Sequence, residues 1–312
     1  MTMRIGYLLP TREQVMEGRP EARSLLELAV RAEQLGFDSI WVGDSLLARP
    51  RHEPLTLLAA VAGRVPRVQL GTAVLLPALR NPVVLAHIVA TLDQVSEGRL
   101  ILGVGIARDT PDIRAEFTAA GVPFEKRVGR MLEGIALAKQ LWSGQPVDWD
   151  GRWQLAAQTL GPTPHRPGGP PFWLAGSLPV SLERAGQHFD GWLPNAGSPA
   201  EWRDQWARLR QHAAAAGRDP EALTGAMYLT LAVDKEQSRA DAKLDRYLES
   251  YYHAPATALR RRQACFAGPR SAAADWLGGY IEAGIDHVVL RFAGDHIAQL
   301  EAVAELRTRF GW

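Results

Sequence analysis

Short apolar runs alternate with longer stretches of helical spacing along most of the chain. The runs are continuously apolar, which is typical of strands in a parallel sheet that is covered on both faces. About eight such strand–helix units follow one another, with no low-complexity linker between them. The pattern therefore predicts an α/β fold, with a (β/α)8 TIM barrel as the first choice and a doubly wound sheet as the second.

The predicted strands are the apolar runs at residues 4–9, 39–43, 68–76, 99–104, 171–175, 191–194, 226–233 and 287–291. The predicted helices are the stretches with helical spacing at residues 21–35, 55–63, 83–95, 124–142, 180–188, 199–216, 241–252, 272–283 and 297–309. Two segments lie outside this rhythm: residues 143–169, with a hairpin around Asp150-Gly151, and residues 249–269. We expect a single barrel domain over residues 1–312, in which these two insertions are lids or interface pieces.

Charge and cysteine content narrow the function classes. The chain has 35 basic and 34 acidic residues, a formal net charge of +1, which gives no electrostatic reason to expect nucleic acid or an anionic membrane as the main partner. The single cysteine, Cys265, excludes an internal disulfide and a thiolate metal cluster. The N-terminal apolar stretch is too short for a signal peptide or a membrane span. We therefore expect a cytoplasmic protein without a metal.

Common catalytic motifs are missing from the sequence, which has no G-x-S-x-G elbow, no P-loop and no H-E-x-x-H pair. Gly103-x-Gly105 follows a predicted strand, but the third glycine of a dinucleotide fingerprint is replaced by Arg108. Gly176-Ser177 precedes a predicted helix, where free backbone N–H groups suit a phosphate, although an ordinary helix cap is the commoner explanation. In a barrel, catalytic residues lie at the C-terminal ends of the strands, so we look for the site there.

Several stretches resemble the bacterial luciferase-like flavin oxidoreductase family. They are residues 29–45, 67–107, 121–127, 172–177, 189–192 and 282–292, and they keep the family's order over most of the chain. The most specific block contains TLDQVSEGR, between the third and fourth predicted strands. The resemblance implies a (β/α)8 barrel that binds FMN, or in a large branch the deazaflavin coenzyme F420, at its C-terminal mouth. It does not identify a substrate.

The same resemblance implies where the cofactor binds. The third-strand pair matches the position at which the family bulges its backbone behind the flavin ring, often through a non-prolyl cis peptide. The residues after the fourth strand match a segment that lines the flavin, and those after the fifth match a phosphate loop, with an arginine that could pair with the phosphate. The implied cofactor-binding residues are Thr72, Ala73, Gly105, Ile106, Ala107, Arg108, Gly176 and Ser177.

One departure from the family concerns catalysis. Many members carry a histidine directly after the acidic residue that closes the second strand, whereas this chain has Asp44-Ser45. We take Asp44 and His52 as the candidate catalytic residues. Asp44 could contact the flavin edge or only cap the loop. His52 could replace the missing histidine, unless the reaction needs no base.

Three arginines lie on loops at the mouth side of the predicted barrel. Arg49, Arg51 and Arg80 could favour an anionic substrate or a charged deazaflavin tail. Solvated surface arginines are the commoner case, and we expect that here.

Three functions are compatible with the resemblance. The first is an FMN-dependent monooxygenase that uses reduced flavin and O2 on a small organic substrate, with a separate flavin reductase as a partner. The alternative is an F420-dependent dehydrogenase or reductase, in which hydride passes directly between cofactor and substrate. The third is a non-catalytic flavin-binding subunit. Family members often dimerise, so we expect a homodimer, with Trp202 and Trp206 either on its interface or in the core.

Overall fold

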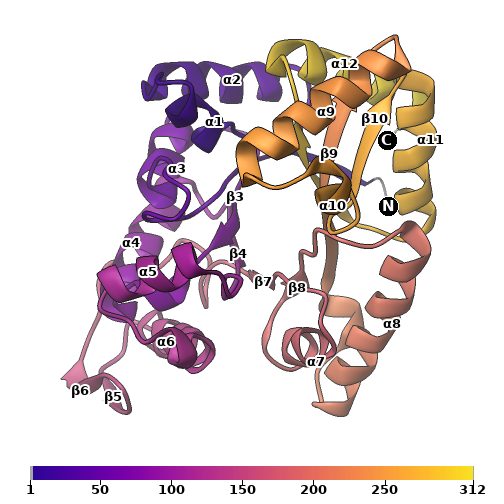
Figure 1. The fold of residues 1–312 in the computed structure, drawn as a ribbon. Coiled ribbons are helices and arrows are strands. Elements are labelled where there is room, and N and C mark those ends of the chain that lie inside the picture. The colour runs from indigo at the N-terminus through magenta and orange to yellow at the C-terminus, as the bar shows by residue number, and fades with distance from the viewer. Residues whose placement is uncertain (1–2, 312) are drawn as a thin grey trace.

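The computed structural model describes residues 3–311, and its main sheet is a closed barrel (Figure 1). The sheet has nine strands, of which eight close the barrel and β10 (Cys265–Gly268) extends it beside β9. The barrel strands, in order around the sheet, are β1 (Arg4–Leu8), β2 (Ser39–Val42), β3 (Gln69–Leu75), β4 (Leu100–Val104), β7 (Phe172–Leu174), β8 (Gly191–Trp192), β9 (Thr224–Val233) and β11 (His287–Phe292). Because β11 pairs with β1 in parallel, the sheet closes, and the predicted TIM barrel is confirmed over the doubly wound alternative.

Helices cover the outside of the barrel (Figure 1). Those that match predicted helices are α2 (Ala22–Gln34), α3 (Pro54–Ala62), α4 (Pro82–Val95), α6 (Arg127–Leu141), α7 (Pro179–His188), α8 (Pro199–Ala215), α9 (Gln237–Tyr252), α11 (Arg270–Glu282) and α12 (His296–Phe310). The sequence did not predict α1 (Thr11–Met16), α5 (Pro111–Ala119), α10 (Ala256–Arg260) or β10. α1 and α10 have 6 and 5 residues, too few turns for a periodic apolar stripe. α5 is as long as α3, but its large buried apolar side chains are Ile113 and Phe117 alone, which is a weak apolar stripe.

The two insertions occupy opposite ends of the barrel. Residues 143–169 contain the predicted hairpin, β5 (Val147–Asp150) with β6 (Gln154–Gln158). The segment docks at the end where the strands begin, because the Arg166 N–H donates to Asp93 Oδ2 at 2.8 Å, below the start of β4. Residues 249–269 lie instead at the C-terminal mouth, where Tyr252 contacts Arg291 near the end of β11. Of the two predicted lid candidates, only the second covers the mouth.

Aromatic side chains fill the lower interior of the barrel. The rings of Trp41 and Trp173 lie 5.5 Å apart, and His287 contacts both edge-on. His287 Nε2 and Trp41 Nε1 both hydrogen-bond to Ser39 Oγ, at 2.7 and 2.6 Å. Burial lowers the pKa of His287 to about 3, with the charge of Arg4 adding to the effect. A ligand in this barrel therefore has to lie above these residues, at the mouth.

Trp202 and Trp206 belong to the packed interior rather than to an exposed face. Trp202 is fully buried, stacks on Trp192 at 5.8 Å and donates its indole N–H to the carbonyl of Ala226 at 3.1 Å. Trp206 stacks on the same two rings. Core packing explains this pair, and the homodimer stays a prediction without support from it.

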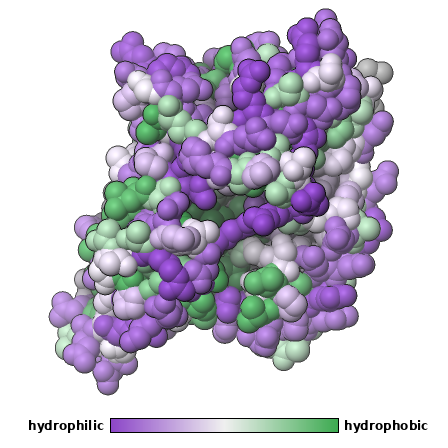
Figure 2. Space-filling model, in the orientation of Figure 1, coloured by the Kyte–Doolittle hydropathy of each residue, from purple (hydrophilic) through white to green (hydrophobic). Residues whose placement is uncertain are grey.

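The helices that follow the C-terminal ends of β1, β4 and β9 lie on one face of the molecule. Figure 2 shows this face hollowed near its centre, with hydrophobic residues inside the hollow. No helix in the described part of the chain is long and apolar enough to cross a membrane.

Candidate active site

The end of β3 has an irregular backbone. The pairing of β3 with β4 shifts register between Thr72 and Leu75, and the peptide bond between Ala73 and Val74 is cis. Thr72 is buried and donates its hydroxyl to the carbonyl of Gly103 at 2.8 Å, so it fastens β3 to β4. Ala73 and Val74 are partly exposed at the mouth. The expected bulge is present, with the cis bond one position after Thr72-Ala73.

The end of β4 offers main chain in place of side chains. A Cβ atom on Gly103 would overlap the carbonyl oxygen of Thr72, and one on Gly105 would lie 2.8 Å from Val74 Cγ2. The N–H of Gly105 donates to the carbonyl of Leu75 at 2.9 Å. Glycine at both positions lets the two strand ends approach closely and leaves a flat floor. A planar ring system is the kind of ligand that such a floor accepts.

The predicted residues after Gly105 turn away from the strand. Ala107 has a left-handed backbone, with φ of 60°, and the carbonyl of Ile106 accepts a hydrogen bond from Arg127 Nε at 2.9 Å. Arg108 is exposed at the rim. Its predicted pairing with a phosphate stays a prediction.

The segment after β7 differs from the expected serine cap. Helix α7 begins at Pro179 with Leu178 as its N-cap, so Ser177 lies one residue too early to cap it. Gly176 has a φ of +113°, and its carbonyl accepts the indole N–H of Trp192 at 2.8 Å. Leucine has no side-chain acceptor, so α7 has no side-chain cap. Pro179 has no N–H and the N–H of Ser181 donates to the carbonyl of Leu178 at 2.7 Å, which leaves the N–H of Val180 as the first-turn donor suited to an anion.

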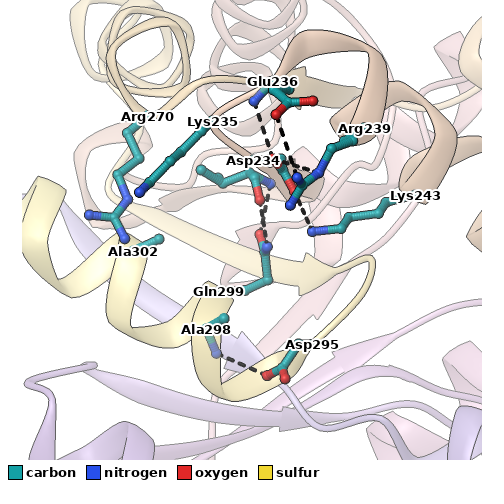
Figure 3. Close-up of a pocket in the computed structure, with 11 residues that line it drawn as sticks. Asp234, Lys235, Glu236, Arg239, Lys243, Arg270, Asp295, Ala298, Gln299 and Ala302 are labelled. Atoms are coloured by element: carbon teal, nitrogen blue, oxygen red, sulfur yellow. Dashed lines mark hydrogen bonds and ion pairs between the residues drawn. The ribbon is translucent and has the colours of Figure 1, made fainter.

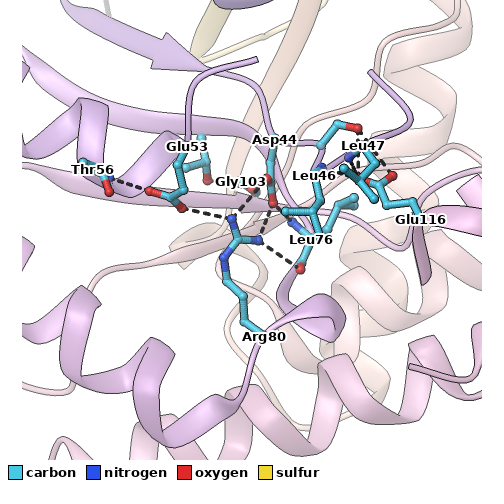
Figure 4. Close-up of polar contacts among 11 residues, drawn as sticks. Asp44, Leu46, Leu47, Glu53, Thr56, Leu76, Arg80, Gly103 and Glu116 are labelled. Atoms are coloured by element: carbon cyan, nitrogen blue, oxygen red, sulfur yellow. Dashed lines mark hydrogen bonds and ion pairs between the residues drawn. The ribbon is translucent and has the colours of Figure 1, made fainter. Parts of the chain in front are cut away.

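Asp44 is held in a buried ion pair (Figure 4). Its side chain is 3% exposed and accepts hydrogen bonds from Arg80 at 2.6 and 3.1 Å and from the N–H of Leu76 at 2.8 Å. Arg80 also pairs with Glu53 at 3.0 Å. These contacts tie the end of β2 to the segment after β3, which favours the loop-capping role of Asp44. Its catalytic role stays a prediction, and Arg80 is neutralised rather than free to bind an anion.

Ser45 fastens the loop after β2 to Glu116 of α5, which Figure 4 shows beside Leu46 and Leu47. Its hydroxyl donates to Glu116 Oε1 at 3.0 Å and accepts from the N–H of Arg49 at 2.9 Å. Glu116 is 1% exposed and also accepts the N–H groups of Leu46 and Leu47. Where many family members carry a histidine, this chain therefore carries a group that fixes the shape of the loop.

His52 contacts the outer rim of the mouth. Its Nε2 lies 2.7 Å from the carbonyl oxygen of Pro20, between α1 and α2. That position is on a different segment from the glycine floor, so the contact gives no support to the predicted catalytic role.

A buried cation lies near the end of the last barrel strand, a position that the sequence marks as a candidate without assigning it a role. Arg291, near the end of β11, is 1% exposed and donates to Thr230 Oγ1 at 2.8 Å, Gln263 Oε1 at 2.7 Å and Tyr252 Oη at 2.7 Å. Tyrosine rings, that of Tyr251 among them, surround its guanidinium at 5.1–5.3 Å. Its place at a strand end was the only available signal in the sequence, because the tyrosines come from other segments.

Arg51 also departs from the expectation of a solvated surface residue. It donates to the carbonyl of Arg49 at 3.1 Å and to Tyr251 Oη at 3.0 Å. Its guanidinium lies where a side chain on Gly43, at the end of β2, would have to be. Arg51 therefore points into the mouth.

Two cavities lie outside the barrel mouth. One, of about 410 Å³, lies between the end of β9 and α12 (Figure 3). There Lys243 donates to Asp234 at 2.6 Å and, with a backbone hydrogen bond, lowers the pKa of Asp234 to about 2. The side chain of Gln299 accepts the N–H of Val233 and donates to its carbonyl. Because the polar groups that line this cavity bond to one another, we interpret it as a structural feature.

A larger cavity, of about 1040 Å³, runs along α1, α2 and α9.

Acidic and histidine side chains do not cluster as metal ligands. Over residues 3–311 there is no group of three His, Cys, Asp or Glu side chains that could hold a metal ion.

Comparison with known proteins gives matches over most of the chain. The family model described as luciferase-like monooxygenase matches residues 3–305. The F420-dependent glucose-6-phosphate dehydrogenase of Amycolatopsis mediterranei is 35% identical over 228 residues, which cover 70% of this chain and 67% of that protein. The enzyme of the same name from Nocardia farcinica is 30% identical over 299 residues, with coverage of 87% and 88%.

Solved structures show the same fold. An F420-dependent secondary alcohol dehydrogenase superposes with a TM-score of 0.84 at 22% identity, covering 98% of both chains. The monooxygenase RslO1 from Streptomyces bottropensis superposes with a TM-score of 0.80 at 24% identity, covering 99% of this chain and 100% of that one. At these identities the likeness concerns the fold alone.

These relatives correct the first functional hypothesis. We expected an FMN-dependent monooxygenase ahead of an F420-dependent dehydrogenase or reductase. That order was wrong, because the curated relatives at 30–35% identity are named F420-dependent dehydrogenases. The sequence could not set the order, since the resemblance implies the same binding position for either cofactor.

Proposed function

Because the chain belongs to the luciferase-like monooxygenase family and is an enzyme of that group of oxidoreductases, we propose that it is an F420-dependent dehydrogenase or reductase of a small organic molecule. The observation that carries the proposal is the shared name of the relatives, several of which are at least 30% identical over two thirds or more of their length. The geometry of the mouth supports it.

The residues at the mouth fit a deazaflavin. At Gly103 and Gly105 any side chain would collide with Thr72 or Val74, so the main chain of the two strand ends lies close together and forms the floor. Ala73 and Val74 are partly exposed beside it. At the end of β7, Gly176 leads into the uncapped N-terminus of α7, which suits the phosphate of the cofactor. The flat part and the charged part of the cofactor thus each find a suitable surface.

A bound deazaflavin supplies the ring carbon at which hydride is exchanged with a substrate. The chain contributes orientation and exclusion of water. Trp41 and Trp173 close the barrel below the floor, so water has no route from beneath. The loop held by Ser45 and Glu116 fixes the side wall at β2. Asp44, held by Arg80 and by the N–H of Leu76, fixes the end of β2 against the segment after β3.

Titration of the purified protein with coenzyme F420 and, separately, with FMN tests the proposal. We expect F420 to bind at least about tenfold more tightly, a difference of roughly 1.4 kcal/mol. With F420 bound, the absorbance of the cofactor should change when a substrate is added without O2. Tighter binding of FMN, or oxygen uptake with reduced FMN, would contradict the proposal.

A cytoplasmic location and a homodimer belong to the same proposal. The support for the first is the single, half-buried thiol of Cys265. Light scattering on the purified protein measures its oligomeric state directly, and a monomer at micromolar concentration would contradict the proposed homodimer.

A further inference from the structure

Four arginines gather on the side of the mouth formed by β11, β1 and β2. We call Arg12, Arg49, Arg51 and Arg291 the arginine cluster. They come from α1, from the loop after β2 and from β11. The guanidinium carbons of three of them, Arg12, Arg51 and Arg291, lie 4.9, 5.9 and 5.1 Å from the ring centre of Tyr251. Four positive charges thus share one small region in a chain whose net charge is +1.

Arg12 is the least satisfied of the four. It is 4% exposed, and its Nε and Nη1 atoms are buried without a hydrogen-bond partner. Burial lowers its pKa, and the charges of Arg51 and Arg49 add to that effect. Face-on contact with a tyrosine ring compensates a buried guanidinium only in part. A buried donor without a partner is destabilising, so the position calls for an acceptor.

Carboxylates do not balance the cluster. Among the described residues, no acidic side chain lies within salt-bridge distance of these four arginines, whereas Arg80 nearby has two such partners. One carboxylate, Glu13, lies near enough for its charge to raise the pKa of Arg12 and Arg51, but it forms no ion pair with them and accepts the hydroxyl of Tyr247. Arg291 is hydrogen-bonded to neutral oxygens alone. A single carboxylate does not balance four crowded positive charges, and a bound anion would lower the remaining repulsion.

The arginine cluster borders the floor on which the ring would lie. The guanidinium of Arg51 covers Gly43, and a Cβ on Gly43 would be 3.6 Å from the carbonyl oxygen of Ala73. The predicted cofactor phosphate site at Gly176 follows β7, which is separated from β1 and β2 by β3 and β4. An anion in the arginine cluster would therefore lie beside the ring and away from that phosphate site.

We propose that the arginine cluster binds an anionic group, a phosphate or a carboxylate, of the substrate. The inference rests on the proposed function, because the anchored molecule has to reach the ring with its other end. The acidic tail of coenzyme F420 is a second source of the same chemistry, and the test separates the two.

The first experiment measures the melting temperature of cofactor-free protein against inorganic phosphate, for the wild type and for Arg12→Met. We expect phosphate to raise the melting temperature of the wild type, and Arg12→Met to weaken this response by about tenfold or more in phosphate concentration. Without phosphate, Arg12→Met should melt higher than the wild type, since it removes a buried charge that has no partner. Arg67→Met is the control: Arg67 is 71% exposed at the opposite end of the barrel, and its variant should respond as the wild type does.

Two results would overturn the proposal. One is an equal response of the wild type and Arg12→Met to phosphate. The other is a lower melting temperature of Arg12→Met without phosphate, which would make Arg12 a structural residue.

The second experiment identifies the source of the anion. Arg12→Met should bind F420 within about twofold of the wild type, a difference below 0.5 kcal/mol, and glucose 6-phosphate and a small dicarboxylate should compete with inorganic phosphate. Weaker F420 binding by about tenfold would assign the cluster to the cofactor tail and overturn the assignment to substrate. If the wild type responds to phosphate as expected and yet binds no F420, the proposed function fails while the anion site stands.

Discussion

The two sides of the barrel mouth differ in the chemical groups that form their surfaces. At β3, β4 and β7 the surface is main chain, glycine and alanine, and its shape depends on strand ends that approach closely. At β11, β1 and β2 it consists of arginines enclosed by the tyrosines of α9. Backbone surfaces suit a ligand that a whole family shares, whereas long side chains from separate segments suit one that varies between members. The comparison predicts that variants of the two sides will differ in which ligand they lose.

Gly105→Val should give the largest effect. Its Cβ would lie 2.8 Å from Val74 Cγ2, so the side chain would occupy the floor, and we expect binding of F420 to weaken by about 100-fold or more. Phosphate binding at the arginine cluster should be unchanged. Gly278→Val is the control, because no atom lies within 4 Å of its Cβ position. Fluorescence titration measures the F420 affinity of both variants. If Gly105→Val bound F420 as tightly as the wild type, the glycine floor would not be part of the cofactor site.

Asp44→Asn tests the ion pair that ties the end of β2, on the arginine side, to the segment after β3, on the glycine side. The amide leaves Arg80 without its buried counter-ion, so we expect the free energy of unfolding to fall by about 2 kcal/mol. Asp109→Asn, which alters an exposed pair with Arg114, should leave the stability almost unchanged, because solvent screens that pair. Urea denaturation measures the difference. An unchanged stability together with a kcat lowered by about 100-fold would instead restore Asp44 as a catalytic residue.

The pH dependence of anion binding tests the arginine side of the mouth. Burial raises the pKa of Tyr247 and of Tyr251 above the ordinary value, so these hydroxyls stay protonated across the neutral range. Burial lowers the pKa of Arg12, so loss of its charge would weaken binding on the alkaline side. Between pH 5 and 8, protonation of the ligand should therefore determine how its affinity depends on pH.

Affinity for a phosphomonoester should rise severalfold as pH rises through its second pKa of about 6. Affinity for a dicarboxylate should stay flat above about pH 5. Calorimetry at several pH values measures both profiles. A fall in affinity between pH 6 and 8 for both ligands would point to a titrating group in the protein and contradict the assignment to arginine.

His52→Gln should give the smallest effect. Its ring contacts Pro20 outside both sides of the mouth, so we expect kcat to stay within about twofold, whereas loss of a general base lowers it about 100-fold or more. Steady-state kinetics with F420 measures this. A large loss would mean that the loop moves His52 inward during turnover.

The sequence carries information about the two sides unequally. The barrel and the glycine floor could be predicted because both follow from local pattern: continuous apolar runs for the strands, and small residues directly after them. The role of Arg12 could not, since the polar segment TREQ lies outside the predicted helices and strands, and Tyr251, whose ring contacts the buried Arg12, is distant in the sequence. The partner of Asp44 was equally hidden, because Arg80 lies on another loop.

The carboxylate of Glu116 has a consequence for how this mouth can change. It holds the main chain of Leu46 and Leu47, whose side chains are 55% and 57% exposed, so α5 determines the path of a loop to which it does not belong. Mutation at those two positions would alter what the rim presents without altering its course. Exchange of the loop between relatives, by contrast, would succeed only if α5 travels with it. The loop and α5 therefore act as one structural unit, on which the side chains of the two leucines can be exchanged.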